Sequence, residues 1–356
     1  MISKETLGFS GKAYHIVPQE PDDLFALRRI IEPGDIIVSN TTRVIKYDKE
    51  YSRPDRERIH IKISLKVDKI NLDNSIDKLR VSGIIIDSNN DLVSKGTNHS
   101  IMINPGTHFI LEKKRKWNTF ELNILNSKDS GNYILISIDQ NESSVAKLSG
   151  THLQIIPNIY SGKSGKYYAE STKSGHSVES YFNSISYSIS SQLQDADHEI
   201  IIFGPGETKR RLSNYLIEKS ILNKNKIVII EGIDSGGEDG IFLFLRSSQL
   251  KEVLSSSKIS IVSSLIDKLL FYVNRNEEKF SIGFNDVSSS VLLNAVESII
   301  FSDNVLKNVD EESLISLLNT AEKFGAKIYA VDSSTDIGLR VSSLGGIIAL
   351  LRYQLR

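Results

Sequence analysis

The sequence predicts a multi-domain protein of the α+β and α/β classes, with a small β-barrel domain at 1–130, a central α/β domain at 131–259 and a C-terminal α/β domain at 260–356. In the first third, apolar and polar residues alternate as in half-buried strands. Further on, apolar strand segments alternate with helical segments, which is typical of α/β domains. A chain of 356 residues is also too long to fold around one hydrophobic core of ordinary size. The polar segment 127–132 (SKDSGN) marks the first boundary, and a softer one lies near Ser255–Ser260.

One helix and several strands are expected in the first domain. Pro21, Asp22 and Asp23 begin the helix, because proline fits a first helical turn and carboxylates favour its positive end. Pro33 and Gly34 end it. The expected strands are Ile36–Val38, Val44–Tyr47, Ile59–Val67, Leu79–Ile86 and Phe109–Leu111. Residues 48–57 are expected to form a charged loop, and 87–90 a hairpin turn.

Residues 41–69 are the most informative stretch, with nine Lys or Arg against five acids. In its second half Ile59, Ile61, Ile63, Leu65 and Val67 alternate with polar residues, and Lys62 is one of these. A strand with one apolar and one basic face, preceded by a charged loop, is suited to contact a polyanion.

Strands and helices alternate in the other two domains. In the central domain we expect strands at Tyr133–Ile138, Val145–Leu148, Ile200–Phe203 and Ile227–Glu231, and helices at Val178–Leu193, Glu207–Glu218 and Ile241–Leu245. This alternation predicts a mostly parallel sheet. In the last domain we expect helices at Ser264–Asn274, Ser288–Val296 and Asp310–Phe324, and strands at Phe280–Gly283, Ile299–Ser302, Lys327–Val331 and Ile347–Leu351.

Composition excludes several classes of site. The chain has no cysteine, which rules out disulfides, thiolate metal sites and thiol nucleophiles. The first domain carries 21 Lys and Arg against 18 Asp and Glu (+3), whereas the last carries 9 against 12 (−3). This asymmetry suggests RNA at one end and proteins at the other. We expect a cytoplasmic location, because the first residues do not form a signal peptide and no apolar run reaches membrane-spanning length.

Three features leave more than one interpretation. The turn at Gly204–Gly206 and the following Lys209, Arg210 and Arg211 fit either a tight βα turn, which is favoured, or an anion-binding helix start. Glu20, Asp22 and Asp23 fit a divalent-metal site, but the helix dipole alone explains acids there. Trp117, after four basic residues, can stack on a base or pack on the core. The seven histidines show no ligand spacing.

An ordered set of segments resembles the Pelota family of ribosome-rescue factors, which are related to class-1 translation release factors. The segments are EPGDIIVSNTTRVIK (32–46), RIHIKISLKVDKI (58–70), LRVSGIII (79–86), GTHFILEKKRKW (106–117), IIIFGPGETKRRLSNYL (200–216), GGEDGIFLFL (236–245) and LGGIIALLRYQL (344–355). They cover essentially the whole chain, and the absence of an acidic tail after the final strand resembles archaeal members.

The resemblance implies an Sm-like β-barrel N-terminal domain, a central α/β domain shared with release factors, and a C-terminal α/β sandwich of the kink-turn-binding ribosomal-protein type. It further implies a monomer, without membrane contact, that enters the empty A site of a stalled ribosome and contacts rRNA and mRNA. The implied partners are an elongation factor 1-alpha-like GTPase, which delivers the factor, and a ribosome-recycling ABC-type ATPase, with which it splits the subunits in mRNA surveillance (no-go decay).

The central domain departs from the release-factor pattern. The segment SGKSGKYYAESTKSG at 161–175 has no Gly-Gly-Gln, so the group that positions water at the peptidyl-tRNA ester is missing and no peptide release is expected. Its lysines instead suit RNA. The expected RNA-binding residues are Arg43, Lys46, Arg53, Arg56, Arg58, Lys62, Lys163 and Lys166.

An endoribonuclease activity of the first domain, which has been ascribed to the family, is the alternative. It would require a divalent cation at Glu20, Asp22 and Asp23, whereas ribosome binding requires no cofactor.

Overall fold

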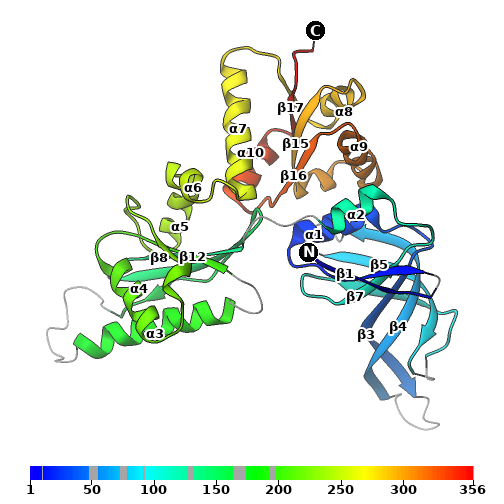
Figure 1. Ribbon diagram of the computed structural model, residues 1–356, viewed down its shortest axis with the longest axis horizontal. Coiled ribbons are helices and arrows are strands. Elements are labelled where there is room, and N and C mark those ends of the chain that lie inside the picture. Colours follow the sequence, from blue (N-terminus) through cyan, green and yellow to red (C-terminus); the bar gives the residue numbers. More distant parts are fainter. Residues whose placement is uncertain are drawn as a thin grey trace. The chain divides into compact units, whose positions relative to one another are not determined.

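The computed structural model describes residues 1–9, 11–47, 55–72, 78–90, 93–126, 132–162, 174–192 and 198–355. The chain forms two compact units (Figure 1). The first combines Met1–Asp129 with Tyr272–Arg356, and the second is Ser130–Phe271. Helix α7 (Lys258–Asn274) runs through the position where the second unit ends. Within the described ranges, no helix is both long and apolar enough to span a membrane.

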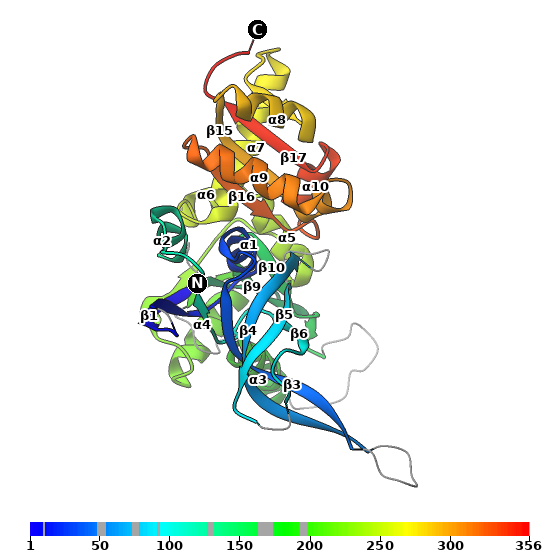
Figure 2. The same cartoon turned by 90° about the vertical axis from the view of Figure 1, so that its right-hand side faces the viewer.

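A strongly curved antiparallel sheet forms the N-terminal part of the first unit (Figure 2). Its described strands follow the order β1-β2-β7-β3-β4-β5-β6. Their bounds are β1 Ile2–Leu7, β2 Lys12–Val17, β3 Ile36–Tyr47, β4 Asp55–Leu72, β5 Leu79–Ser88, β6 Asn98–Ile103 and β7 Phe109–Glu112. The N-terminal residues through Val17 thus form two strands that the sequence pattern did not predict, because β1 is largely exposed and has no apolar alternation.

Two helices complete this part. Helix α1 (Pro21–Ile30) begins and ends close to the predicted positions, and it buries Leu24, Leu27 and Ile30 against the sheet. Helix α2 (Thr119–Leu125) was not predicted. Its start is nevertheless encoded locally, because Asn118 and Glu121 form a capping box in which each side chain accepts the other residue's backbone N–H.

The predicted alternation in β4 is confirmed where the structure describes its side chains. Ile61, Ile63, Leu65 and Val67 are at most 3% exposed, and Lys62 is exposed. The strand is longer than expected, since it starts at Asp55, inside the predicted loop, and continues to Leu72. The β4–β5 pairing shifts register twice, between Ser64 and Leu65 and between Val67 and Lys69. Such bulges bend a strand and help to curve the sheet.

The C-terminal part of the first unit is a smaller α/β layer structure. Its sheet has the order β14-β17-β15-β16. The strands are β14 Phe280–Ile282, β15 Val296–Ser302, β16 Lys327–Val331 and β17 Ile347–Leu351, and the helices are α8 Phe284–Leu292, α9 Glu311–Lys323 and α10 Asp336–Ser343, with a 3₁₀ turn at Asp303–Lys307. Helix α8 begins and ends earlier than predicted, because Val296 already belongs to β15.

Alternate residues of β15 point to opposite faces of this sheet. Ile299 and Phe301 pack in the core with Leu314 and Leu318 of α9. Ser302 faces the other way, where its hydroxyl lies 2.9 Å from that of Ser342 in α10. The sheet is therefore covered on both sides, which explains its nearly continuous apolar strands.

The two parts of the first unit meet through α1 and α9. Phe25 of α1 lies against Phe301, with ring centroids 4.8 Å apart. Arg28, 5% exposed, pairs with Glu311 and Glu312, and Arg29 pairs with Glu322. Part of the opposite charge of the two ends of the chain is thus neutralised inside this unit.

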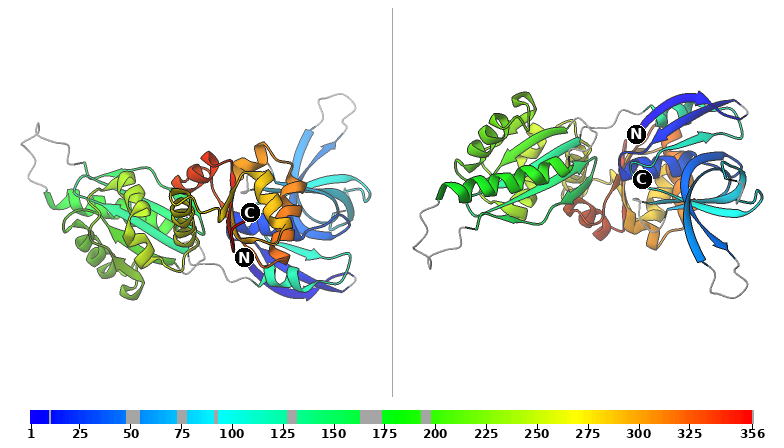
Figure 3. Two further views of the ribbon diagram at one scale, coloured as in Figure 1. Left: turned by 90° about the horizontal axis from the view of Figure 1, so that it is seen from above. Right: turned by 90° about the horizontal axis from the view of Figure 1, so that it is seen from below.

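The second unit contains one mixed sheet (Figure 3). Its described strands follow the order β10-β9-β8-β12-β13, and β11 pairs with β9. The strands are β8 Asn132–Ile138, β9 Glu142–Ser149, β10 His152–Ile155, β11 Ile159–Tyr160, β12 His198–Phe203 and β13 Ile227–Ile229. The pairs β8–β12 and β12–β13 are parallel, but every pair with β9 is antiparallel. The prediction of a mostly parallel sheet was therefore wrong, because three of the five described strand pairs are antiparallel and all three involve β9, which follows β8 in a tight hairpin.

Helices cover both faces of that sheet. Helices α3 (Ser174–Gln192) and α4 (Thr208–Glu218) pack on the face of Ile134, Ile136 and Ile200. Helix α5 (Gly237–Arg246) packs on the other face, where Phe244 stacks on Phe203 at 4.6 Å between ring centroids. The short helix α6 (Ser248–Val253) follows α5.

Candidate nucleic-acid interface

The predicted RNA-binding stretch forms the long antiparallel ribbon of β3 and β4, which extends away from the remaining strands (Figure 2). Register places Lys46 opposite Arg56 and Val44 opposite Arg58. Like charges directly opposite each other destabilise a strand pair. Lys46 and Arg56 are thus cationic residues at paired positions in the outer part of a two-stranded ribbon, an arrangement that a polyanion would favour.

The same register sorts the other predicted residues. Lys62 lies opposite Asn40, in the alternating set of positions that includes Arg56 and Arg58, and it is exposed. Arg43 lies opposite Ile59, in the intervening set, so the structure does not group it with the other cations. Arg53, Lys163 and Lys166 lie outside the described residues, as does most of the 161–175 segment.

The acidic candidates Glu20, Asp22 and Asp23 lie at the start of α1, where Glu20 and Asp23 cap the helix. Glu20 is the N-cap residue and is buried. Asp23 accepts the backbone N–H groups of Gln19 (2.7 Å) and Glu20 (3.3 Å) and pairs with the Met1 ammonium at 2.8 Å. In the described ranges, no three His, Cys, Asp or Glu side chains converge as a metal site would require. The geometry thus supports the helix-start interpretation.

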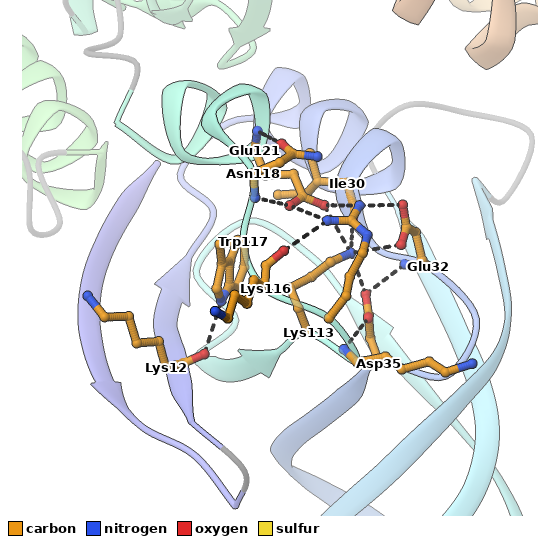
Figure 4. Close-up of polar contacts among 11 residues, drawn as sticks. Lys12, Ile30, Glu32, Asp35, Lys113, Lys116, Trp117, Asn118 and Glu121 are labelled. Atoms are coloured by element: carbon orange, nitrogen blue, oxygen red, sulfur yellow. Dashed lines mark hydrogen bonds and ion pairs between the residues drawn. The ribbon is translucent and has the colours of Figure 1, made fainter.

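A buried charge cluster that sequence reasoning missed holds the basic segment 113–116 (Figure 4). The Lys113 ammonium is fully buried and donates to Asp35 Oδ2 (2.7 Å) and to the Ile30 carbonyl (2.5 Å). Glu121 Oε1 lies 3.2 Å from the same ammonium. Asp35 Oδ1 accepts the backbone N–H of Lys114 at 2.9 Å. The run KKRK gave no signal that its first lysine points inward.

Arg115 closes this cluster from the outside. Its guanidinium donates to both carboxylate oxygens of Glu121 and, at 2.8 Å, to Glu32 Oε1. These hydrogen bonds, that of Glu121 first, raise the pKa of Arg115 above its usual value. Burial raises the pKa of Glu32, but the hydrogen bond from Arg115 and the charge of Lys113 outweigh it, so the net pKa lies below the usual value. Arg115 and Glu32 are therefore both charged at neutral pH.

The Gly204–Gly206 turn is closed by a side chain of this protein. The Lys209 ammonium, buried with its residue 4% exposed, donates to the carbonyls of Gly204 (2.9 Å) and Gly206 (2.8 Å) and pairs with Glu231 at 2.8 Å. A Cβ on Gly204 would lie 2.1 Å from the Ile138 carbonyl oxygen, so only glycine fits. The Lys209 ammonium thus has a structural role and already has its partners. Arg210 also pairs with Glu231. The geometry favours the tight βα turn over a phosphate cradle.

The Gly-Gly pair at 236–237 also has a structural role. Gly237 adopts a φ of +61°, and a Cβ there would lie 2.9 Å from the Glu142 carboxylate carbon. The pair begins α5 close against the β8–β9 hairpin. It is thus explained by packing.

Comparisons with known proteins cover the chain from its first to its last domain, and they agree with the fold described above. Residues 2–128 match a family model described as the Pelota N-terminal domain, and residues 259–355 match one described as eRF1 domain 3. A crystal structure of the Thermoplasma acidophilum Pelota protein is similar in fold, with a TM-score of 0.61 and 23% identity, and the match covers 100% of both chains.

Curated relatives match over nearly the whole length. A protein pelota homolog of Nitrosopumilus maritimus (strain SCM1) is 46% identical over 342 residues, which is 96% of each chain. A protein pelota homolog of Cenarchaeum symbiosum (strain A) is 37% identical over 344 residues, 96% of this chain and 97% of the other. Because identity of this level extends through all three predicted domains, the chain belongs to the Pelota family.

Proposed function

We propose that this protein recognises ribosomes stalled with an empty A site and promotes dissociation of their subunits, without hydrolysing peptidyl-tRNA. Membership of the Pelota family over 96% of the chain supports the general role. The single structural observation that carries RNA contact is the β3–β4 ribbon, where Lys46 and Arg56 occupy directly opposed positions. RNA phosphates supply the anions that such a pair attracts.

The partners follow from the family. The protein is delivered by an elongation factor 1-alpha-like GTPase and acts with a ribosome-recycling ABC-type ATPase in the cytoplasm. The similarity of the C-terminal part of the first unit to eRF1 domain 3 is the basis for placing the protein contacts there. The absence of Gly-Gly-Gln from the sequence supports a role without peptide release.

A reconstituted splitting reaction tests the proposal. Purified ribosomes stalled on a truncated mRNA, with labelled peptidyl-tRNA, are incubated with the GTPase, the ATPase and this protein, and then separated by gradient sedimentation. We expect free subunits to accumulate only when this protein is present, with the peptidyl-tRNA ester intact. An unchanged monosome peak, or released peptide, would contradict the proposal.

No observation in the structure favours the endoribonuclease alternative. Asp23 already accepts two backbone N–H groups and an ammonium, and Glu20 is buried at the helix start. A direct assay compares cleavage of mRNA by the protein and by its Asp22→Asn variant, with divalent cations present. Cleavage that disappears in the variant while α1 stays folded would establish the nuclease and overturn our preference.

A further inference from the structure

A cavity of about 830 Å³ lies in the N-terminal part of the first unit, between the start of β2 and the segment that joins β7 to α2. None of the residues that line it belongs to β3 or β4. Those that matter here are Lys12, Tyr14, Lys114, Lys116 and Trp117. Pockets of about 300–1,000 Å³ are typical of small-ligand sites, so the cavity can hold a nucleotide-sized group.

One wall of the cavity is aromatic and fixed in place. The Trp117 indole N–H donates to the Lys12 carbonyl at 3.0 Å (Figure 4). The Tyr14 ring contacts the indole edge-to-face, with centroids 4.8 Å apart and planes at 72°. Because the polar group of the indole is already satisfied, what the ring offers to a ligand is its π face. A base can stack there with little ordering cost to the protein.

The other wall carries a positive charge without a carboxylate partner. Lys116 is exposed, and in the described part of the chain no ion pair joins its ammonium to a carboxylate. Lys114 is exposed too, but its side chain lies along Gly34, which does not line the cavity. Other charges at the cavity are committed: Lys12 pairs with Glu5 at 2.9 Å, and Arg115 is held by the cluster. The buried Glu112 carboxylate also lines the cavity, and its Oε2 accepts the Phe9 N–H at 2.7 Å.

The cluster beneath this segment explains why the site is preformed. Lys113 and Asp35 are buried with their side chains 0% exposed, and Asp35 also holds the Lys114 backbone. A buried ion pair contributes little net stability relative to apolar packing. Its evident effect here is geometric, because it pins the segment that carries Lys114, Lys116 and Trp117 in one conformation.

We propose that this cavity binds one nucleotide of single-stranded RNA, with the base stacked on Trp117 and the phosphate held by Lys116. The proposal rests on the proposed function, because a factor acting in the A site meets rRNA and mRNA. An acidic peptide would use the lysine but not the aromatic wall. Bases of an intact duplex are unavailable for stacking, so an unpaired nucleotide is the favoured occupant.

Trp117 provides a site-specific signal, because it is the only tryptophan in the chain. The full-length protein is titrated with single-stranded RNA of about eight nucleotides, a length within the usual site size, while its intrinsic fluorescence is followed. We expect saturable quenching by single strands and none by a duplex of the same sequence or by polyglutamate. Quenching that is absent, or equal with duplex or polyglutamate, would overturn the proposal.

Substitutions test the phosphate contact and the stacking contact separately. Lys116→Ala removes one phosphate contact, so the slope of log affinity against log salt should flatten by about 0.7 units. Lys307→Ala, which removes the same charge at an exposed position in the C-terminal part of the unit, should leave quenching by RNA unchanged. Trp117→Leu, followed by anisotropy of labelled RNA, should weaken binding about tenfold. Equal effects of the two lysine variants would reduce the site to general charge attraction and overturn it.

Cosedimentation with stalled ribosomes separates this proposal from the proposed function. If the wild-type protein binds ribosomes but RNA leaves Trp117 fluorescence unchanged, the nucleotide site fails and the rescue function stands. If RNA quenches Trp117 but the protein neither binds nor splits ribosomes, the rescue function fails and the nucleotide site stands.

Discussion

Lys113 and Lys114 are adjacent and chemically identical, yet their environments are opposite. The Lys113 side chain is fully buried among three carboxylates, whereas Lys114 is exposed. Both lie just after the end of β7, where the Asp35 carboxylate pairs with the Lys113 ammonium but accepts only the backbone N–H of Lys114. Individual residues in this chain thus take their roles from the partners that the fold brings to them.

The Lys113→Met substitution should destabilise the first unit by about 3–5 kcal/mol, because Asp35 would remain buried as an uncompensated charge. The matched change Lys114→Met, at an exposed position, should stay within about 0.5 kcal/mol. Urea unfolding followed by Trp117 fluorescence measures both. Similar midpoints for the two variants would refute a structural role for the buried pair.

At the scale of elements, the turn between β12 and α4 shows how one helix residue fixes a loop. Lys209 reaches back from the first turn of α4 to two carbonyls of the turn and to Glu231, just after β13. The hydrogen bond from Lys209, then that from Arg210, lowers the pKa of the Glu231 carboxyl below its usual value of 4.5.

This lowered pKa makes the contribution of Glu231 dependent on pH. A carboxyl with a depressed folded-state pKa stabilises the protein above its unfolded pKa and loses that effect as pH falls through the folded value. Wild type should therefore be more stable than Glu231→Gln at neutral pH, and the difference should shrink below about pH 4.5. Thermal melts at a series of pH values test this. A difference that grows on acidification would contradict the assignment.

The β3–β4 ribbon is the other element with a testable feature, because its register pairs two cationic residues. Arg56→Glu places opposite charges at the paired positions 46 and 56, so it should leave the ribbon as stable or improve it by about 0.2–1 kcal/mol. Combined with Arg58→Glu, it should nevertheless weaken ribosome binding and flatten its salt dependence. Filter binding at several salt concentrations, with a melting curve for each variant, checks both parts. Unchanged binding across salt would remove the ribbon from the interface.

Seen as a whole molecule, the chain joins its first and last segments in one unit through α1 and α9. The charge difference between its ends predicted RNA contact on one side and protein contact on the other. The structure adds a third use, since Arg28 and Arg29 of the basic end pair with acids of the acidic end. Net charge along a sequence cannot separate charges used inside the fold from charges left for partners.

Removing Arg28 should loosen this junction. Arg28→Ala leaves Glu311, whose side chain is 19% exposed, without its partner, and should cost about 2–5 kcal/mol. Arg340→Ala removes an exposed pair with Asp336 and should cost less than about 1 kcal/mol. Calorimetry of both variants compares the two losses. Equal small losses would show that the junction does not depend on Arg28.

Sequence pattern located most strands and helices because their apolar periodicity is local. It missed β1, β2, β6, β10, β11, α2, α6 and α10, which are short or largely polar, and it misjudged α8 because Val296 continues the apolar pattern into β15. It expected separate strands at Ile36–Val38 and Val44–Tyr47, where β3 runs unbroken from Ile36 to Tyr47, and it gave no register for the pairing with β4. The RNA roles of Arg43, Lys46, Arg56, Arg58 and Lys62 remain predictions.

The sequence by itself determined the family, the alternation of β4 and the absence of a Gly-Gly-Gln tip, since each is written in the order of residues along the chain. Only the tertiary structure decided which cations are available. It buried Lys113 against Asp35, 78 positions away, used Lys209 to close its own turn and left Lys116 exposed beside Trp117. The reason is physical: the cost of a charge depends on the dielectric and the partners around it, and both come from residues distant in sequence.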